Sequence, residues 1–249
     1  MQCVILAGGL GTRMGPLTER VAKTLLPVLG HPFAEYQLRW LSGQGVRSVV
    51  YCIGFLGEQI RTFVGDGSRW DFERVTYVDD GPRLMGTGGA LRRAHETGVL
   101  EEGFLVVYGD SYIPVEVAPI WRTSEAGRVP VLTVLRNGGR WDASNAVFHD
   151  GHVVLYEKGR ADAAAIGMDY IDYGLSVLPR KLVAENIPSN KPHDLAALYG
   201  AISRRGGLRG FEVVTRFYEI GSPGGLRDLE EHLKSAAGEE RDRRVIEKS

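Results

Sequence analysis

The stretch Leu6-Ala7-Gly8-Gly9-Leu10-Gly11-Thr12-Arg13-Met14 begins where an apolar run, Gln2–Ala7, ends. That run has the pattern of a buried strand. The three glycines of the stretch let the backbone approach an anion closely, because their N–H groups can turn in toward phosphate oxygens. The spacing differs from the dinucleotide-binding pattern G-x-G-x-x-G, which needs glycine where Met14 stands, and from the P-loop, which needs Gly-Lys-Ser/Thr. A plain tight turn would leave Thr12 and Arg13 unexplained. We therefore expect an anion-binding loop at the end of the first strand.

Outward from this loop, short apolar runs alternate with helical patterns through the first half of the chain. The apolar spacing predicts helices over 32–41 and 56–64 and a third around 91–95. Further strands are predicted at 46–54, 73–78 and 104–108. Strand and helix alternating at this spacing imply right-handed crossovers and a mostly parallel sheet. The first half therefore predicts a Rossmann-like α/β architecture, with helices on both faces of the sheet.

The second half of the chain changes character. Strands are predicted at 129–135, 145–149, 153–157 and 170–178, and the turn signal Asp150-Gly151 indicates an antiparallel pair. Helices are predicted at 194–204 and 224–233, with a strand pair over 211–220 around Thr215-Arg216. No repeat or Pro/Ser-rich linker divides the chain. We expect one mixed α/β domain over residues 1–237 and a charged tail, a frayed solvated helix, over 238–249.

Composition narrows the function classes. The chain has 249 residues, 30 Lys+Arg against 31 Asp+Glu, and a formal net charge of −1. This near-neutral charge lacks the excess of Lys and Arg that is typical of nucleic-acid-binding proteins. An anionic ligand must therefore be held by a local basic site. No apolar run is long enough for a membrane span, and the start has no basic segment typical of a secretory signal. Cys3 and Cys52 lie in apolar runs, where buried reduced thiols are expected. These features predict a cytoplasmic protein that binds neither nucleic acid nor membrane.

Two basic side chains flank the glycine loop. Arg13 closes it, and Lys23 opens the segment Lys23-Thr24-Leu25-Leu26-Pro27-Val28 ten residues on. Cations beside a glycine loop suit a triphosphate, because each offsets charge that water would otherwise solvate.

Five motifs together resemble the sugar-1-phosphate nucleotidylyltransferase family. LAGGLGTRM and the following AKTLLPVLGHP resemble its signature LAGG-x-GTR-(L/M) … PK-x-(L/M)-x-P(V/I). MGTGGALRRA, VVYGDSY, YIDYGLSVL and RFYEIGSPGGLRDL are similar to its later elements, in the same order. The resemblance implies transfer of a nucleotidyl group from an NTP to a sugar-1-phosphate, with release of pyrophosphate. It also implies that the antiparallel strands of the second half form a small sugar-binding subsite.

The resemblance implies a role for each matching position. Arg13 and Lys23 would be catalytic, and Asp110 with Glu219 would hold Mg²⁺, although the family usually has aspartate where Glu219 stands. The nucleotide would be bound by Leu6, Ala7, Gly8, Gly9, Gly11, Thr12, Asp80, Gly86 and Thr87. The sugar phosphate would be bound by Asn145, Glu157, Lys158, Asp172 and Gly174, where Asp172 replaces the common asparagine.

The base and the sugar remain open at this point. The chain is similar to the small D-glycero-D-manno-heptose-1-phosphate guanylyltransferases, and Leu56–Trp70 resembles the N-acetylmuramate-1-phosphate uridylyltransferases. An acidic group near the base favours GTP, because guanine offers two adjacent donors and uracil one. A molybdenum-cofactor guanylyltransferase resembles the chain only at its front, and a silent nucleotide-sugar sensor on the same fold is a further alternative. A homo-oligomer is possible. His149 and His152 have a spacing seen in some metal sites, but the turn between them favours an exposed hairpin.

Overall fold

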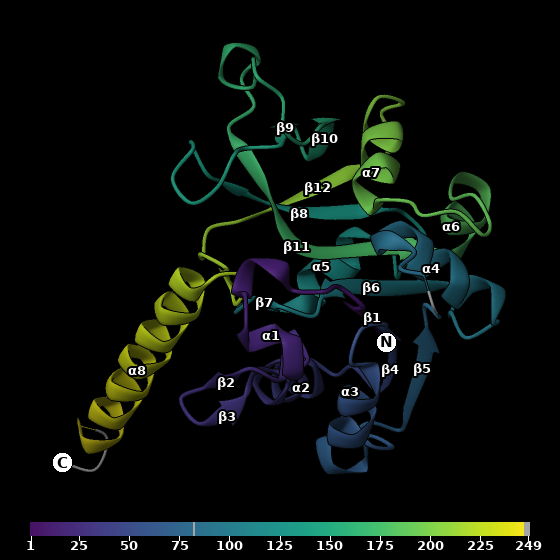
Figure 1. Cartoon of the computed structure of the whole chain (residues 1–249). Coiled ribbons are helices and arrows are strands. Elements are labelled where there is room, and N and C mark those ends of the chain that lie inside the picture. Colours follow the sequence, from purple (N-terminus) through teal and green to yellow (C-terminus); the bar gives the residue numbers. More distant parts are fainter. Residues whose placement is uncertain (82, 247–249) are drawn as a thin grey trace.

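The computed structural model describes residues 1–81 and 83–246, with side chains described up to residue 236. Within these residues a nine-stranded sheet runs through the molecule in the order β5-β4-β1-β6-β11-β8-β12-β10-β9 (Figure 1). Its strands are β1 (Gln2–Ala7), β4 (Ser48–Ile53), β5 (Arg74–Asp79), β6 (Gly103–Tyr108), β8 (Val131–Arg136), β9 (Ala146–His149), β10 (His152–Tyr156), β11 (Tyr170–Pro179) and β12 (Arg209–Val213).

Strand direction divides the sheet into two parts. β5, β4, β1 and β6 are parallel, and each of the first three crossovers carries a helix. β11 pairs antiparallel with β6 and β8, and β10 pairs antiparallel with β9 and β12, so only β10 and β11 oppose the other strands. The predicted mostly parallel mixed sheet is confirmed. The predicted antiparallel subsite is an extension of this sheet, built from β8 to β12, rather than a separate sheet.

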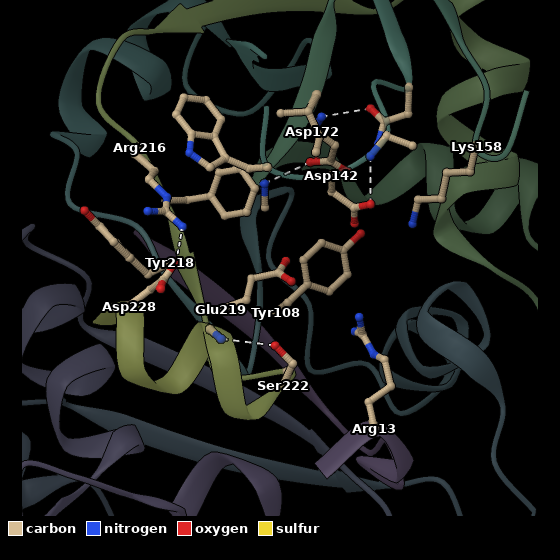
Figure 2. A pocket seen from close by; sticks show the side chains of 18 of the residues that line it. Arg13, Tyr108, Asp142, Lys158, Asp172, Arg216, Tyr218, Glu219, Ser222 and Asp228 are labelled. Carbon is tan, nitrogen blue, oxygen red and sulfur yellow. Dashed lines mark hydrogen bonds and ion pairs between the residues drawn. The ribbon is translucent and has the colours of Figure 1, made fainter. Parts of the chain in front are cut away.

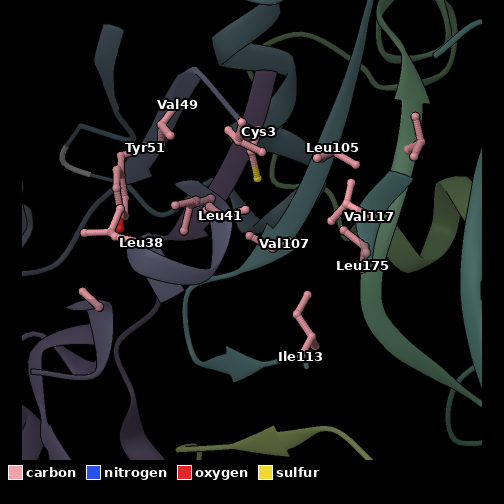
Figure 3. Close-up of a cluster of buried hydrophobic side chains, with 14 of the residues drawn as sticks. Cys3, Leu38, Leu41, Val49, Tyr51, Leu105, Val107, Ile113, Val117 and Leu175 are labelled. Carbon is pink, nitrogen blue, oxygen red and sulfur yellow. The ribbon is translucent and has the colours of Figure 1, made fainter. Parts of the chain in front are cut away.

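Helices cover both faces of the sheet, as predicted. One face is covered by α2 (Phe33–Gly43), α3 (Gly57–Val64) and α5 (Val117–Thr123), and the other by α4 (Gly86–Glu96), α6 (Arg180–Asn186) and α7 (Leu195–Ser203). Alternation along β1 explains the two cores, because Cys3 and Ile5 face the first set of helices while Val4 and Leu6 face the second. Figure 3 shows the first core, where Leu38 and Leu41 of α2 meet Cys3, Val49 and Leu105.

Shorter elements connect the sheet to its edges. α1 (Leu17–Arg20) follows the 3₁₀ turn η1 (Thr12–Met14), and the other 3₁₀ turns are η2 (Lys23–Leu25), η3 (Ser68–Trp70) and η4 (Ala164–Ile166). A small ribbon pairs β2 (Pro27–Val28) with β3 (His31–Pro32), and a second pairs β7 (Ser111–Tyr112) with β13 (Tyr218–Glu219). Helix α8 (Pro223–Ile246) projects from the body (Figure 1).

Two expectations for the last third differ from the structure. The strand pair over 211–220 is wrong: β12 joins the large sheet beside β8, whereas β13 pairs with β7. The residues between them do not form a hairpin because each strand finds its hydrogen-bond partner in a distant segment. The last helix, expected to end at residue 233, instead runs without a break from Pro223 to Ile246 and so includes part of the helix expected in the tail. The expected solvated character of 238–249 lies outside the described side chains.

The other local expectations concern buried and exposed side chains. Cys3 and Cys52 are buried free thiols, as predicted. Asp150-Gly151 forms the predicted turn between β9 and β10, and His149 and His152 are exposed beside it. In the described part of the chain, no helix is long and apolar enough to cross a membrane.

Candidate active site

Two pockets open side by side at the carboxyl ends of the parallel strands, where α/β sheets place ligands. The first, here called the glycine pocket, encloses about 240 Å³ and is lined by Leu6, Ala7, Gly8, Gly9, Gly11, Lys23, Thr24, Cys52, Asp80, Leu84, Gly86, Thr87, Ala90, Tyr108, Gly109 and Asp110. The second, here called the charged pocket, encloses about 500 Å³ and includes Arg13, Asn145, Lys158, Asp172, Gly174 and Glu219 in its lining. Tyr108, at the end of β6, borders both.

The glycine pocket exists because small residues leave room for it. Gly11 has φ +66°, and a Cβ there would lie 2.9 Å from the side chain of Thr18, whose hydroxyl donates to the Gly11 carbonyl at 2.9 Å. A Cβ on Gly8 would lie 3.1 Å from the Asp80 carboxylate. The loop is thus held in a conformation that only glycine adopts easily, with backbone rather than side chains facing the cavity.

Asp80 places a carboxylate in the wall of the glycine pocket. Its Oδ2 accepts from the N–H of Met85 at 3.3 Å, while the buried Oδ1 has no hydrogen-bond partner among the described residues. Burial raises the pKa of Asp80 above its usual value. Because Asp80 lines the pocket, its carboxylate is a candidate acceptor for a donor on a bound ligand.

Thr87 also lines the glycine pocket, at the start of α4. Its hydroxyl donates to Asp194 Oδ1 at 3.1 Å and accepts from the N–H of Leu195 at 2.9 Å. The Thr87 hydroxyl therefore hydrogen-bonds the start of α7. Asp80 is the stronger candidate for hydrogen bonding to a base.

Acidic and basic side chains meet where the two pockets join. The Ile220 N–H donates to the Asp110 carbonyl at 3.0 Å, and the β7–β13 pairing sets Glu219 opposite Ser111. This ribbon brings Asp110 and Glu219, far apart in sequence, to neighbouring cross-strand positions. Lys23 forms an ion pair with Asp110. A Cβ on Gly221 would lie 3.1 Å from Arg13 Nη2 and 3.4 Å from Lys23 Nζ, so both cations border this junction.

The charge balance at the junction suits a divalent cation. Burial, and next the charge of Asp110, raise the pKa of Glu219 to about 7, although Lys23 and Arg13 act in the opposite direction. Two crowded carboxylates whose ionisation is penalised gain from an added positive charge. In the described part of the chain no three His, Cys, Asp or Glu side chains come together as a metal-binding group. Mg²⁺ needs no more than one or two protein carboxylates where substrate phosphates and water complete its shell, so Asp110 and Glu219 fit it.

An irregular part of β11 contributes to the lining of the charged pocket. The register with β8 shifts between Asp172 and Ser176, and Gly174 within it has φ +92°. Asp172 Oδ1 accepts from the N–H of Gly174 at 2.9 Å, and Oδ2 accepts from the Tyr156 hydroxyl at 3.1 Å. Asn145 accepts from the N–H of Asp172 at 2.9 Å. The bulge therefore aims a fixed carboxylate into the pocket, and burial raises its pKa.

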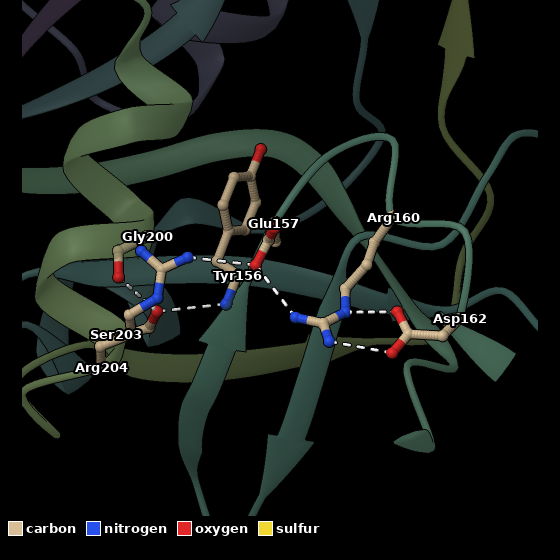
Figure 4. A network of polar contacts seen from close by, with 7 residues as sticks. All are labelled: Tyr156, Glu157, Arg160, Asp162, Gly200, Ser203 and Arg204. Atoms are coloured by element: carbon tan, nitrogen blue, oxygen red, sulfur yellow. Dashed lines mark hydrogen bonds and ion pairs between the residues drawn. The ribbon is translucent and has the colours of Figure 1, made fainter. Parts of the chain in front are cut away.

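Two of the predicted site residues lie outside both pockets. Thr12 is exposed in η1. Glu157 accepts from Arg160 at 3.2 Å and from Arg204, which follows the end of α7, at 3.1 Å (Figure 4). Both residues follow the end of β10 at Tyr156, where Lys158 lines the charged pocket while the two arginines hold Glu157 outside it.

Several lining residues of the charged pocket were not assigned from the sequence. They are Tyr108, Asp142, Arg216, Tyr218, Ser222 and Asp228, together with Trp141, for which stacking and burial were both open. Tyr108 could have been found, because it ends a buried strand just before Gly109-Asp110. Arg216, Tyr218, Ser222 and Asp228 lie in the motif RFYEIGSPGGLRDL, from which only Glu219 was assigned, whereas nothing in the pattern around Trp141 and Asp142 signals a pocket.

Comparison with known proteins connects the chain to enzymes. The sequence model of the family described as "MobA-like NTP transferase domain" matches residues 3–186, which extends from β1 through β11 to α6 and so reaches well beyond the front of the chain. The glucose-1-phosphate thymidylyltransferase of Streptomyces antibioticus is 31% identical over 175 residues, covering 68% of this chain and 48% of that protein. The match spans about half the length of that relative.

Two further proteins are similar over more of their length. The D-glycero-alpha-D-manno-heptose 1-phosphate guanylyltransferase of Aneurinibacillus thermoaerophilus is 26% identical over 162 residues, covering 64% of this chain and 68% of that protein. The crystal structure of HddC from Yersinia pseudotuberculosis complexed with GMP-PN superposes with a TM-score of 0.73 at 25% identity, covering 93% of this chain and 99% of that one.

Proposed function

Because this chain belongs to the family of MobA-like NTP transferase domains, we propose that it joins an NTP and a sugar-1-phosphate into an NDP-sugar, releasing pyrophosphate. The sequence-based prediction of a nucleotidylyltransferase agrees with this family, and the two relatives named for sugar-1-phosphate substrates support the acceptor. The observation that carries the proposal is the junction, where Asp110 from the glycine pocket and Glu219 from the charged pocket are brought together.

The two pockets have complementary tasks in this reaction. The glycine pocket offers backbone to a triphosphate and Asp80 to its base, and the charged pocket offers Lys158, Asp172 and Asn145 to a sugar phosphate. The substrates then meet at Tyr108, which borders both cavities. Holding two reactants in adjoining sites converts a bimolecular step into one between bound groups.

The chemistry needs little beyond positioning and charge. A phosphate monoester is already anionic at neutral pH, so its oxygen can attack the α-phosphorus in line without a general base. Arg13 and Lys23 are placed to stabilise charge on the departing pyrophosphate and the α-phosphate. Mg²⁺ held by Asp110 and Glu219 would offset phosphate charge.

The glycine pocket favours GTP. Guanine presents an N1–H and an exocyclic amine side by side, which a carboxylate can accept together, and Asp80 places a carboxylate in the lining of this pocket. Uracil and thymine flank their one N–H with carbonyl oxygens, which a carboxylate repels. We propose a sugar-1-phosphate like that of a heptose, since one relative is a heptose 1-phosphate guanylyltransferase.

Pyrophosphate release tests the reaction and the base together. The purified protein is incubated with Mg²⁺, each of GTP, UTP, CTP, ATP and dTTP, and a panel of sugar-1-phosphates that includes mannose-, glucose-, heptose- and N-acetylmuramate-1-phosphate. We expect release that depends on both substrates and is fastest with GTP. NTP binding without release from any pair would instead support a silent sensor.

The base assignment has its own variant. Asp80→Asn should lower kcat/KM for GTP by about tenfold, because one acceptor becomes a donor facing a donor, and should change UTP use little. Asp79→Asn, at an exposed neighbouring carboxylate, is the matched control. An equal loss with GTP and UTP would show that Asp80 does not read the base.

A further inference from the structure

The end of the charged pocket farthest from the glycine loop has no role in the reaction described above. Figure 2 shows Arg13 and Lys158 on one side of the pocket and Arg216, Tyr218 and Asp228 on the other, with Glu219 and Tyr108 between them. We call Trp141, Arg216, Tyr218 and Asp228 the far end. The phosphate of a bound sugar belongs at the side of Arg13 and Lys158, so the far end faces the part of the sugar that points away from the reaction.

Arg216 is held in place at the far end. Its Nη2 donates to Asp228 Oδ2 at 2.5 Å, and its guanidinium carbon lies 4.8 Å from the ring centre of Tyr218 and 5.7 Å from that of Trp141. The Arg216 side chain is 35% exposed and lines the charged pocket, so part of the guanidinium is accessible to a ligand. A fixed guanidinium with donors to spare is a preorganised site for an oxygen-bearing group.

The charges at the far end favour hydroxyl groups over an anion. Asp228 already offsets the charge of Arg216, and Asp142 adds a further carboxylate to the pocket lining. Arg13 and Lys158, by contrast, form no ion pair in the described part of the chain. A hydroxyl can accept from Arg216 and donate to a carboxylate at once. Trp141, 37% exposed, offers an aromatic surface against which the C–H groups of a sugar can pack.

The loop that carries Trp141 is built to hold it still. Asn137, fully buried, donates from Nδ2 to the Asp142 carbonyl at 2.6 Å and accepts at Oδ1 from the N–H of Trp141 at 3.2 Å. These bonds fix the connection between β8 and β9 from inside. A fixed loop is what a selective site requires, because a mobile one would adapt to many ligands.

We propose that the far end is a subsite for a hydroxylated side chain on the sugar ring, and that Arg216 selects sugars longer than a hexose. The inference rests on the proposed function, since it names which sugar-1-phosphates the charged pocket prefers. A heptose carries one more hydroxylated carbon beyond its ring than mannose does, and this added group is the one that Arg216 and Asp228 would bind.

The test compares two sugars that differ by that carbon. The kcat/KM with GTP and Mg²⁺ is measured for D-glycero-D-manno-heptose-1-phosphate and for mannose-1-phosphate, in the wild type and in Arg216→Ala, Arg216→Lys and Trp141→Ala. We expect Arg216→Ala to lower kcat/KM for the heptose at least about tenfold and for mannose less than about threefold. Arg216→Lys should not rescue it, because an ammonium lacks the planar fork of donors.

Arg61→Ala is the matched control. Arg61 also lies over a tyrosine, 4.6 Å from the ring centre of Tyr77, and also pairs with a carboxylate, Glu58, but far from both pockets. Its loss should leave the ratio between the two sugars unchanged.

Each other outcome points to a different failure. An unchanged heptose-to-mannose ratio in Arg216→Ala and Trp141→Ala overturns the subsite and leaves the proposed function intact. Rescue by Arg216→Lys, or a selective loss with N-acetylmuramate-1-phosphate, would replace hydroxyl recognition by anion binding and also overturns it. If the wild type turns over neither sugar with any NTP, the proposed function fails, and calorimetric titration with the two sugar phosphates then decides the subsite by the same ratio.

Discussion

The glycine pocket and the charged pocket lie side by side, yet they are built in different ways. The first is lined largely by backbone and small residues from a few short motifs that end neighbouring parallel strands. The second is lined by long side chains from β8–β9, β10–β11 and the β12–α8 segment, which are distant in sequence. The difference indicates that the nucleotide half is fixed by local backbone geometry, while the sugar half is adjustable by substitution of single side chains.

The largest loss of turnover should come from a change at the junction. Both pockets depend on the junction, so such a change should not distinguish the nucleotide side from the sugar side. Lys23→Ala removes the cation that pairs with Asp110 and lies near Glu219, so Arg13 is the one side chain left of the two cations that border the junction. We expect turnover to fall about 100-fold or more, with every sugar and every NTP alike. Lys181→Ala, at an exposed ion pair with Glu185, is the control. Thermal unfolding checks the fold, and near-normal turnover would remove Lys23 from the mechanism.

The next effect sharpens the comparison on the nucleotide side. Gly8→Ala places a methyl 3.1 Å from the Asp80 carboxylate, inside a pocket made of backbone. We expect the Kd for GTP to rise about tenfold, since the methyl displaces Asp80, while the Kd for the sugar phosphate stays constant. Calorimetric titration of each substrate measures both. Gly43→Ala, where an added Cβ meets nothing within 4 Å, should change neither; a matching loss of sugar binding would show that the pockets are not independent.

A smaller effect is expected on the sugar side. Glu157 joins the loop carrying Lys158 to α7 through Arg204, so it positions a ligand-binding lysine without lining the pocket. Glu157→Gln should raise KM for the sugar phosphate about threefold and leave kcat and the KM for GTP unchanged, because a weakened surface ion-pair network lets the loop move. Glu58→Gln provides the control. A kcat effect as large as that of Lys23→Ala would place Glu157 at the reaction instead.

The smallest effect concerns pH and stability in the metal-free protein. Because the pKa of Glu219 is raised from 4.5 to about 7, the folded state binds more protons than the unfolded state between these values. Stability is therefore lost as the pH rises from about 4.5 through about 7, by on the order of 1 kcal/mol, or about 3 °C in Tm. Glu219→Gln should flatten this slope, and Mg²⁺ should stabilise the wild type more at pH 8 than at pH 5.5. Equal slopes in the variant and the wild type would contradict the assigned pKa.

Prediction from sequence succeeded where a pattern is local. The strands predicted at 2–7 and 104–108, the turn at Asp150-Gly151 and the helices over the sheet follow from apolar runs, helical spacing and turn chemistry. Prediction from sequence failed at the segment after β12, because the hydrogen-bond partner of a strand can lie far away in the sequence. Glu219 pairs with Ser111 and not with a residue of β12. Prediction also did not show that Glu157 lies outside the lining of both pockets, since a motif match gives position along the chain but not where a side chain points.

The sequence by itself determined the family, the α/β alternation and the glycine loop, because these depend on residue order, on apolar periods and on backbone freedom within a few residues. Only the tertiary structure decided that Asp80 keeps an acceptor without a partner among the described residues, that Asp110 and Glu219 share one junction, and that Arg216 lies between Trp141 and Tyr218 with Asp228. These features depend on burial and on which distant segments meet. No local pattern encodes that.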